Sequence, residues 1–314
     1  MNIVIVGATG MIGGAISAAA LQSGHPVTAL VRDSSRSTLP TGVNRTRMPD
    51  RDEGGDDAWK HSIRNADVVI NLAGEPIGAA RWNPEVKERL VQSRVTTTRR
   101  IVDALLEAAA AGSRPLTLVN ASAVGYYGDC GDEIIIESRG AGVCFLADLC
   151  RKWEEEAMRA SAGGVRVLVM RLGLVLAESG VLQKMLYPLP VHLSPFKLGL
   201  GGPMGSGRQW MPWVHIDDVV GLFLFAAANP DAHGPINVTA PNPVTNAEFA
   251  YELGHVLQRP AVVPIPAFLL RAVVGEFAGA LLSGQRAIPA VPQQLGYQFK
   301  YAHLLEALKQ LIHR

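Results

Sequence analysis

Three glycines near the start of the chain have the spacing of a phosphate-binding turn. Gly7, Gly10 and Gly13 follow the apolar run Ile3–Val6 and lead into residues with helical spacing. After a strand, the first glycine permits a sharp turn, the second lets the backbone approach a pyrophosphate, and the third allows the helix to pack closely on the strand. N–H groups at the start of that helix would face the anion. The pattern predicts that a dinucleotide contacts Gly7, Thr9, Gly10, Met11, Ile12 and Gly13. The alternative is a glycine-rich turn that binds no ligand.

Arg32 is the second candidate for cofactor recognition. It follows the apolar run Val27–Val31, where an NAD site usually carries a carboxylate for the adenosine ribose. A guanidinium at this position could instead bind a 2′-phosphate through charge-assisted hydrogen bonds. The sequence therefore favours NADP(H) over NAD(H). The alternative is a solvated Arg32, with Asp33 recognising the ribose.

Small residues follow another apolar run, Val68–Asn71. Leu72, Ala73 and Gly74 would lie at the carboxyl edge of a parallel sheet, where ligands of open α/β folds bind. The backbone could lie against the nucleotide there. Arg94 stands where a helix could bring its guanidinium to a cofactor phosphate, and an exposed helical arginine is the alternative.

Short β-branched runs alternate with helical stretches up to about residue 170. This alternation is typical of βαβ units and of a parallel sheet that is covered on both faces. We expect an α/β fold, a Rossmann-like doubly wound parallel sheet with a smaller C-terminal substrate lobe. The expected strands are Ile3–Val6, Val27–Val31, Val68–Asn71, Leu116–Asn120 and Val165–Met170, with a weaker one near Arg45–Met48.

The composition of the chain changes after about residue 178, where Pro- and Gly-rich stretches begin. Such stretches interrupt regular elements. We therefore expect an NADP(H)-binding domain over residues 1–178 and the substrate lobe over residues 179–314. Residues 213–240 read as a helix and a strand that return to the first sheet.

Charge and cysteine content exclude several functional classes. With 29 Lys and Arg residues against 28 Asp and Glu, the formal net charge is +1, too small to attract nucleic acid. Cys130, Cys144 and Cys150 lack C-x-x-C spacing, so we expect neither disulfides nor a metal site. The longest apolar stretch, Ala267–Leu282, is shorter than the ~20 residues of a spanning helix. We expect no signal peptide, a cytoplasmic location and no membrane partner.

Further motifs extend along nearly the whole chain. They are Leu72–Ile77, Arg81–Trp82, Ser93–Arg94 with Thr97–Thr98, Ala121–Gly128, Lys152–Glu154, Leu198–Pro203, Gly205–Trp210, Trp213–Asp218, Thr245–Phe249 and Gly284–Arg286. With the glycine turn, they make the sequence resemble the extended short-chain dehydrogenase/reductase superfamily, and within it the atypical group labelled nucleoside-diphosphate-sugar epimerase or SulA-type cell-division inhibitor. The resemblance implies NADP(H), a small-molecule substrate in a cleft under the C-terminal lobe, and a homodimer through helices at about 85–111 and 143–160.

The catalytic pair of that superfamily, Tyr-x-x-x-Lys, is absent from this chain. In such enzymes the tyrosine transfers a proton, and the lysine one helical turn later stabilises its phenolate. Leu146 and Cys150 stand near the expected helix positions. The usual pair therefore cannot be transferred to this sequence.

A substitute set of catalytic residues can be predicted near the end of the expected strand Leu116–Asn120. Ser122 would donate a hydrogen bond to a carbonyl oxygen, Tyr127 would be the acid/base, and Lys152 would approach from the following helix. Tyr126 is the alternative to Tyr127, because adjacent residues of an extended chain point in opposite directions. Tyr127 is preferred since it precedes Gly128, as in the Val-Tyr-Gly signature of the resembling enzymes. An ordinary exposed lysine is the alternative for Lys152.

Two functions are compatible with these residues. The first is an NADP(H)-binding, epimerase-like oxidoreductase that acts on a small carbonyl compound or a nucleotide-linked sugar. The second is a non-catalytic NADP(H)-binding protein with a regulatory or interaction role, and the missing Tyr-x-x-x-Lys pair is its main support.

Overall fold

A seven-stranded parallel sheet forms the centre of the protein. The computed structural model describes residues 1–32, 39–49, 57–112, 116–186 and 194–312. The strand order β11-β7-β5-β4-β1-β2-β3 runs outward in both directions from the β1/β4 pair, as in a doubly wound sheet. Its strands are β1 (Ile3–Val6), β2 (Val27–Val31), β3 (Asn44–Arg47), β4 (Val68–Asn71), β5 (Thr117–Ala123), β7 (Arg166–Leu172) and β11 (Gly234–Val238).

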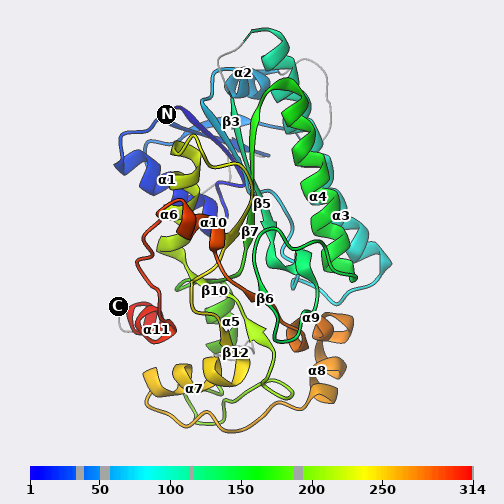
Figure 1. The fold of residues 1–314 in the computed structure, drawn as a ribbon, viewed down its shortest axis with the longest axis vertical. Coiled ribbons are helices and arrows are strands. Elements are labelled where there is room, and N and C mark those ends of the chain that lie inside the picture. Colours follow the sequence, from blue (N-terminus) through cyan, green and yellow to red (C-terminus); the bar gives the residue numbers. More distant parts are fainter. Residues whose placement is uncertain (33–38, 50–56, 113–115, 187–193, 313–314) are drawn as a thin grey trace.

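Helices cover both faces of this sheet, because its central strands are apolar on both sides (Figure 1). Two helices pack on one face, around Ile5, Ile16 and Phe223. Three others pack on the opposite face, around Val69 and Leu105. The first group is α1 (Met11–Gln22) and α6 (Ile216–Ala228), and the second is α2 (Ala58–Arg64), α3 (Pro84–Ala110) and α4 (Phe145–Met158).

The C-terminal lobe lies beyond the carboxyl edge of the sheet, in the lower half of Figure 1. It has its own core, which includes Trp213, Phe249 and Leu308. Its helices are α5 (Val181–Leu186), α7 (Asn246–Val256), α8 (Ala267–Val274), α9 (Ala278–Leu282) and α11 (Leu304–Ile312), and its strands are β8 (Leu174–Leu176), β9 (Trp210–Met211), β10 (Trp213–His215) and β12 (Val244–Thr245).

Short elements connect the lobe to the sheet. Strand β13 pairs with β6, which follows β5 in the chain. These elements are β6 (Ile134–Ile135), β13 (Arg286–Ala287), α10 (Ala290–Gln294) and two 3-10 helices, η1 (Val124–Tyr127) and η3 (Gly275–Phe277). A further 3-10 helix, η2 (Arg159–Gly163), follows α4 and packs against α3.

The start of a helix is fixed by local sequence in two clear cases. The Asn83 side chain accepts the Val86 N–H at 2.7 Å, and Pro84 occupies the first position of α3. At α7, Thr245 and Glu248 form a reciprocal capping box. Both helices therefore begin where side chains satisfy N–H groups that lack a helical partner.

The predicted Rossmann-like fold is confirmed, and the strand ends differ from expectation at two places. β5 and β7 continue to Ala123 and Leu172, beyond the predicted ends at Asn120 and Met170. The added residues include Ser122 and the buried Arg171, and both side chains donate hydrogen bonds to the Glu154 carboxylate. A strand predicted only from its apolar residues therefore ends too early when polar residues continue it. The strands of two or three residues were not predicted, because so short a segment shows no periodicity.

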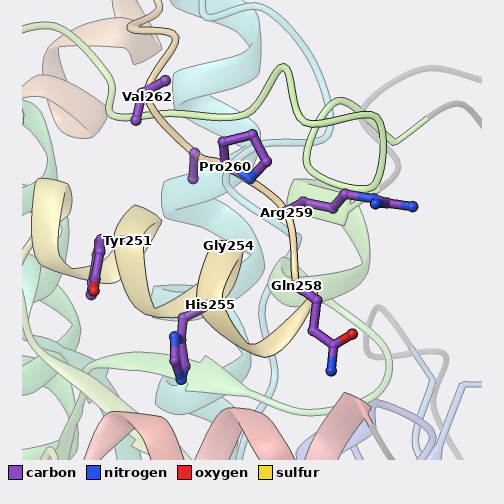
Figure 2. A pocket seen from close by; sticks show the side chains of 8 residues that line it. Tyr251, Gly254, His255, Gln258, Arg259, Pro260 and Val262 are labelled. Carbon is purple, nitrogen blue, oxygen red and sulfur yellow. The ribbon is translucent and has the colours of Figure 1, made fainter.

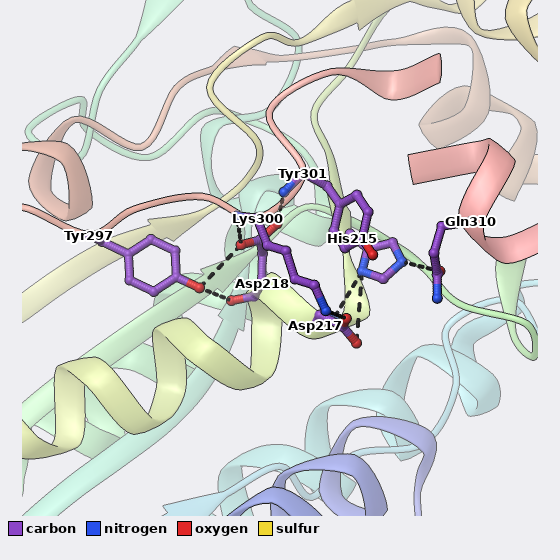
Figure 3. Close-up of polar contacts among 7 residues, drawn as sticks. All are labelled: His215, Asp217, Asp218, Tyr297, Lys300, Tyr301 and Gln310. Carbon is purple, nitrogen blue, oxygen red and sulfur yellow. Dashed lines mark hydrogen bonds and ion pairs between the residues drawn. The ribbon is translucent and has the colours of Figure 1, made fainter. Parts of the chain in front are cut away.

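The N-terminus of α6 anchors the C-terminal segment of the chain (Figure 3). The Asp218 carboxylate accepts the backbone N–H groups of Lys300 and Tyr301 at 2.8 and 2.9 Å. The Tyr297 hydroxyl donates to the same carboxylate at 3.2 Å. A single buried side chain therefore holds residues 297–301 against the first domain.

His215 completes this anchor as the cap of α6. Its Nδ1 accepts the Asp217 N–H at 3.1 Å, so its proton lies on Nε2, which donates to Gln310 Oε1 at 2.9 Å. The ring is fully buried and packs against Tyr301, with 3.9 Å between ring centroids. These contacts make His215 a structural cap of α6.

The buried, neutral His215 predicts a stability that falls in mild acid. Burial lowers the pKa of this imidazole below its usual value of 6.5. The unfolded chain therefore binds the proton more readily, and stability is lost as pH falls below 6.5. Urea unfolding across about pH 8 to pH 5 should show a smaller decline for His215→Asn, which keeps a capping oxygen and does not titrate. Equal declines in both proteins would contradict the role of His215.

Candidate functional site

The glycine turn between β1 and α1 has the geometry that a bound pyrophosphate requires. Gly7 has a φ of 85°, in the left-handed region. A Cβ on Gly13 would lie 2.3 Å from the Gly7 carbonyl oxygen, so only glycine permits this close packing. A Cβ on Gly10 would have one protein neighbour within 4 Å, the Gly7 oxygen at 3.3 Å. Gly10 therefore presents bare backbone outward.

The N-terminus of α1 is suited to an anion. Gly10 caps the helix without a side-chain hydrogen bond, and no acidic residue occupies the first turn. Thr9 and Gly10 are exposed, while Met11 and Ile12 are half-buried. The first N–H groups of a helix lack helical partners, and the helix dipole adds positive charge there. The predicted residues thus lie together around the exposed start of α1.

Arg32 lies exposed directly after β2, at the carboxyl edge of the sheet. Arg47 ends the neighbouring strand, in register with Val31. Two cationic residues therefore come from adjacent strand ends. Asp33, the alternative for recognising the ribose, lies outside the described residues.

The loop after β4 is held against the end of β1. The Leu72 N–H donates to the Val6 oxygen at 2.9 Å, and the Ala73 N–H donates to the Asn71 side chain at 3.1 Å. Asn71 in turn donates to Asn120 and Thr98 at 2.7 and 2.8 Å. This buried polar chain, which the sequence gave no reason to expect, fixes Leu72–Gly74 at the edge where a nucleotide would lie.

Arg94, from α3, holds the same loop through its guanidinium. Its guanidinium donates to the Glu75 carbonyl at 2.8 Å and to the Leu90 carbonyl at 3.1 Å, and it lies over the Trp153 ring. A Cβ on Gly74 would come within 2.9 Å of the guanidinium carbon. Burial lowers the pKa of Arg94, but it stays far above neutrality as an arginine. Arg94 is thus neither an exposed helical arginine nor a free phosphate ligand, because it binds the backbone of the loop.

Ser122 is hydrogen-bonded to a buried ion pair. Its hydroxyl donates to Glu154 Oε1 at 2.6 Å. Arg171 Nε and Nη2 donate to the two oxygens of the same carboxylate, at 3.0 and 2.8 Å. Ser122 and Arg171 are in register on neighbouring strands, so both project from one face of the sheet toward α4. The pair joins β5, β7 and α4.

Tyr127 is directed into the protein and not into a cleft. Its hydroxyl donates to Asn237 Oδ1 at 2.7 Å and accepts from Arg171 at 3.0 Å, and its side chain is 2% exposed. Burial raises the pKa of the phenol to about 12. A proton on this oxygen is therefore held more tightly than in free tyrosine. This geometry argues against Tyr127 as the acid/base and favours a structural role.

Glu137 extends this polar cluster to the C-terminal segment. Its Oε1 accepts the N–H groups of Asn237 and Val291, each at 3.1 Å. Burial raises its pKa. Its Oε2 is buried without a hydrogen-bond partner in the structure. The sequence gives no signal for the roles of Glu137, Glu154 and Arg171, because lone charged residues in apolar surroundings show no spacing pattern.

The other candidates near the end of β5 are distributed differently. Lys152 is exposed on α4 and is not brought to Ser122 by any contact among the described residues. Cys150 is 3% exposed and lies beside Ser122, and burial raises the pKa of its thiol to about 12. A thiol carries no positive charge in either protonation state, so Cys150 cannot replace the missing lysine. Leu146 lies close to Gly125, whose added Cβ would approach it at 3.4 Å.

Tyr126 is the tyrosine that remains available. Its side chain is half-buried, and its hydroxyl has no hydrogen-bond partner within the described part of the chain. The Arg171 guanidinium lies 3.6 Å from its ring centroid, which holds the ring at the carboxyl end of β5.

The doubly wound sheet and the open glycine turn define a Rossmann-like, dinucleotide-binding class of protein. The model of the NAD dependent epimerase/dehydratase family matches residues 3–239, and a domain of unknown function, DUF1731, matches residues 265–311. The chain therefore belongs to the NAD dependent epimerase/dehydratase family. No group of His, Cys, Asp and Glu residues suited to a metal ion occurs in the described ranges, and none of the helices within them is long and apolar enough to cross a membrane.

Relatives of similar length support this membership. An epimerase family protein of Mycobacterium leprae is 41% identical over 98% of this chain and 94% of its own length. The chloroplastic epimerase family protein SDR39U1 homolog of Arabidopsis thaliana is 38% identical over 99% of this chain and 87% of its own. The crystal structure of human epimerase family protein SDR39U1 with NADPH has a TM-score of 0.84 and 31% identity, and covers all of both chains. Because one relative is chloroplastic, a cytoplasmic location stays a prediction.

The buried ion pair predicts unequal effects for two adjacent glutamates of α4. Glu154→Ala should lower the free energy of unfolding by about 3–5 kcal/mol, because it leaves Arg171 as an uncompensated buried charge. Glu155 is exposed and pairs with Arg151. Glu155→Ala should therefore cost less than about 1 kcal/mol. Urea unfolding of the two variants measures both values, and a small effect at Glu154 would rule out the structural importance of the pair.

Proposed function

We propose that this protein binds NADP(H) at the carboxyl edge of its sheet and transfers hydride between the nicotinamide and a small carbonyl compound or nucleotide-linked sugar. The observation that carries the proposal is the uncapped, exposed start of α1 behind bare Gly10. Family membership and the NADPH in the human SDR39U1 structure support it. The bound cofactor supplies the hydride, and the protein binds and orients it.

Each predicted cofactor residue has a separate task in this proposal. The turn from Gly7 to Gly13 binds the pyrophosphate through backbone N–H groups. The Leu72–Gly74 loop lies beside the nucleotide, held in place by Arg94. Arg32 binds the 2′-phosphate through charge-assisted hydrogen bonds, which distinguishes NADPH from NADH.

Gly10, the cap of α1, and Gly14, within α1, provide a matched test of cofactor binding. Gly10→Ala places a methyl group in the predicted path of the pyrophosphate and should weaken NADPH binding by about tenfold or more. Gly14→Ala should leave it unchanged, because that Cβ would have an ordinary 3.6 Å contact with the Ala8 oxygen. Isothermal titration calorimetry measures both affinities, and circular dichroism checks the fold.

The same titration tests cofactor preference. Arg32→Gln should weaken the affinity for NADPH about tenfold or more while leaving the affinity for NADH unchanged, because a charged hydrogen bond contributes about 1.5–3 kcal/mol.

Equal losses of NADPH affinity in the Gly10 and Gly14 variants, or no heat with NADPH in the unaltered protein, would refute the cofactor site.

For proton transfer we propose Tyr126 in place of Tyr127. Tyr126 follows β5 at the carboxyl edge, and among the described residues its hydroxyl has no hydrogen-bond partner, whereas the hydroxyls of Tyr127 and Ser122 both donate hydrogen bonds. Ser122 and Arg171 then act as positioning residues, because they orient the Tyr126 ring and the end of β5. Lys152, exposed on the outer side of α4, has no part in this scheme.

A non-catalytic, NADP(H)-responsive protein is the second candidate function. The apolar Leu146 and the neutral Cys150 at the positions of the missing pair favour it. In that case cofactor binding would alter the arrangement of the two lobes and thereby the binding of a partner.

Paired tyrosine variants distinguish the two functions. With a panel of carbonyl compounds and sugar nucleotides, Tyr126→Phe should lower kcat by about a hundredfold, the usual scale of a lost acid/base. Its NADPH affinity should not change. Tyr127→Phe should retain most of kcat but lower the free energy of unfolding by about 1–3 kcal/mol, because it removes a buried hydroxyl. NADPH binding without turnover on the whole panel would favour the second function.

A further inference from the structure

Helix α8 carries its large apolar side chains on the outside of the protein. Phe268, Leu269 and Val273 are 72%, 46% and 63% exposed, and Ala272 is exposed beside them. At 100° per residue these four positions form one face of the helix. None of the residues of α8 is fully buried. The helix therefore presents an apolar face to solvent, the reverse of an ordinary surface helix.

Neighbouring segments extend this apolar face. Val262 and Val263, 75% and 44% exposed, come shortly before α8. Val263 donates its N–H to the Gly201 oxygen at 3.0 Å, which brings in Leu198 and Leu200, 57% and 60% exposed. We call these side chains, together with those of the α8 face, the α8 surface: Leu198, Leu200, Val262, Val263, Phe268, Leu269, Ala272 and Val273.

An open pocket of 440 Å³ adjoins the α8 surface at Val262 (Figure 2). It lies between α7 and the segment that leads toward α8, with Tyr251 on one side and Pro260 on the other. Arg259 is the charged residue in its lining. Apolar area thus continues from α8 around the end of the C-terminal lobe, and a contiguous exposed patch of this kind marks an interaction site.

The charge around the α8 surface is positive. Residues 257–275 contain Arg259 and Arg271 and no Asp or Glu. The nearest acidic residue along the chain, Glu276, pairs with Lys87 of α3 at 2.6 Å. A symmetric contact between two copies of this surface would bring like charges together. An anionic partner is therefore favoured over a second copy of the chain.

Both ends of α8 are fastened to neighbouring segments. The Glu276–Lys87 pair and the contact of Phe277 with Trp82, at 5.3 Å between ring centroids, fix the segment after α8 to the start of α3. The Gly205 N–H donates to the Ile265 oxygen at 2.9 Å just before α8. Both ends of the helix are fastened, so its outer face stays exposed and available to a partner.

We propose that the α8 surface docks this protein on an anionic lipid membrane. A short helix with an apolar face and neighbouring arginines binds at the interface by burying the apolar side chains among lipid headgroups, while the arginines attract anionic lipids. Such a helix lies on the membrane and does not span it. The expectation of no membrane partner rested on the lack of a spanning segment, whereas this proposal concerns a peripheral contact.

Vesicle co-sedimentation of the full chain tests this proposal. The protein should sediment with vesicles of phosphatidylcholine and phosphatidylglycerol, and much less with phosphatidylcholine alone. The double variant Phe268→Ser/Val273→Ser should lower the partition coefficient by about tenfold or more, because two large apolar side chains no longer enter the interface. Arg271→Gln should lower it by about fivefold on the anionic vesicles only.

A matched control is available on the other lobe. Val143 is fully exposed just before α4, and Val143→Ser should leave vesicle binding unchanged. Each variant should fold, because all the substituted side chains are exposed. Thermal unfolding and NADPH titration check this. The proposal is overturned if the unaltered protein does not bind anionic vesicles, if the α8 double variant binds equally well, or if that variant instead abolishes a dimer seen by light scattering.

Discussion

The buried ion pair between Arg171 and Glu154 is the interaction on which the carboxyl edge of the sheet depends. Two charges removed from water are tolerated only when nearly all of their hydrogen-bonding groups find partners. Ser122, the Tyr127 hydroxyl and the Glu137 carbonyl supply those partners. Burial alone would lower the pKa of Arg171, but the Glu154 carboxylate outweighs it and raises that pKa, so the guanidinium stays charged. One cluster thereby joins three strands, α4 and the C-terminal segment.

This commitment explains why the expected catalytic set is not assembled. Chemistry in the resembling enzymes requires free hydroxyl and ammonium groups at the end of β5, and here two of the hydroxyls are bound to the ion pair. Tyr126, pressed against the outer side of the guanidinium, is left with an unbound hydroxyl. The cofactor turn is unaffected, because it consists of backbone N–H groups and glycines. Binding and catalysis therefore depend on separate parts of the same sheet edge.

The C-terminal segment is fastened to the first domain at two places, and both follow α8 in the chain. Glu276 and Phe277 hold it to the start of α3, and Asp218 holds residues 300–301 to α6. A helix fixed in this way cannot turn its apolar face inward, since the core of the lobe is already filled by residues of α7 and α11. The outward apolar face is thus a consequence of the packing around it.

The sequence by itself determined the sheet, most of its strands and the glycine turn, because these follow from local apolar runs and from the conformations that glycine alone permits. It did not determine the roles of Tyr127, Ser122 and Arg94, since a polar side chain takes its role from whichever groups lie beside it after folding. Arg171 and Glu154 are 17 residues apart in the chain, and no spacing rule relates them. The outward direction of Phe268 and Val273 was likewise decided only by tertiary packing, because an apolar run predicts burial without saying against what.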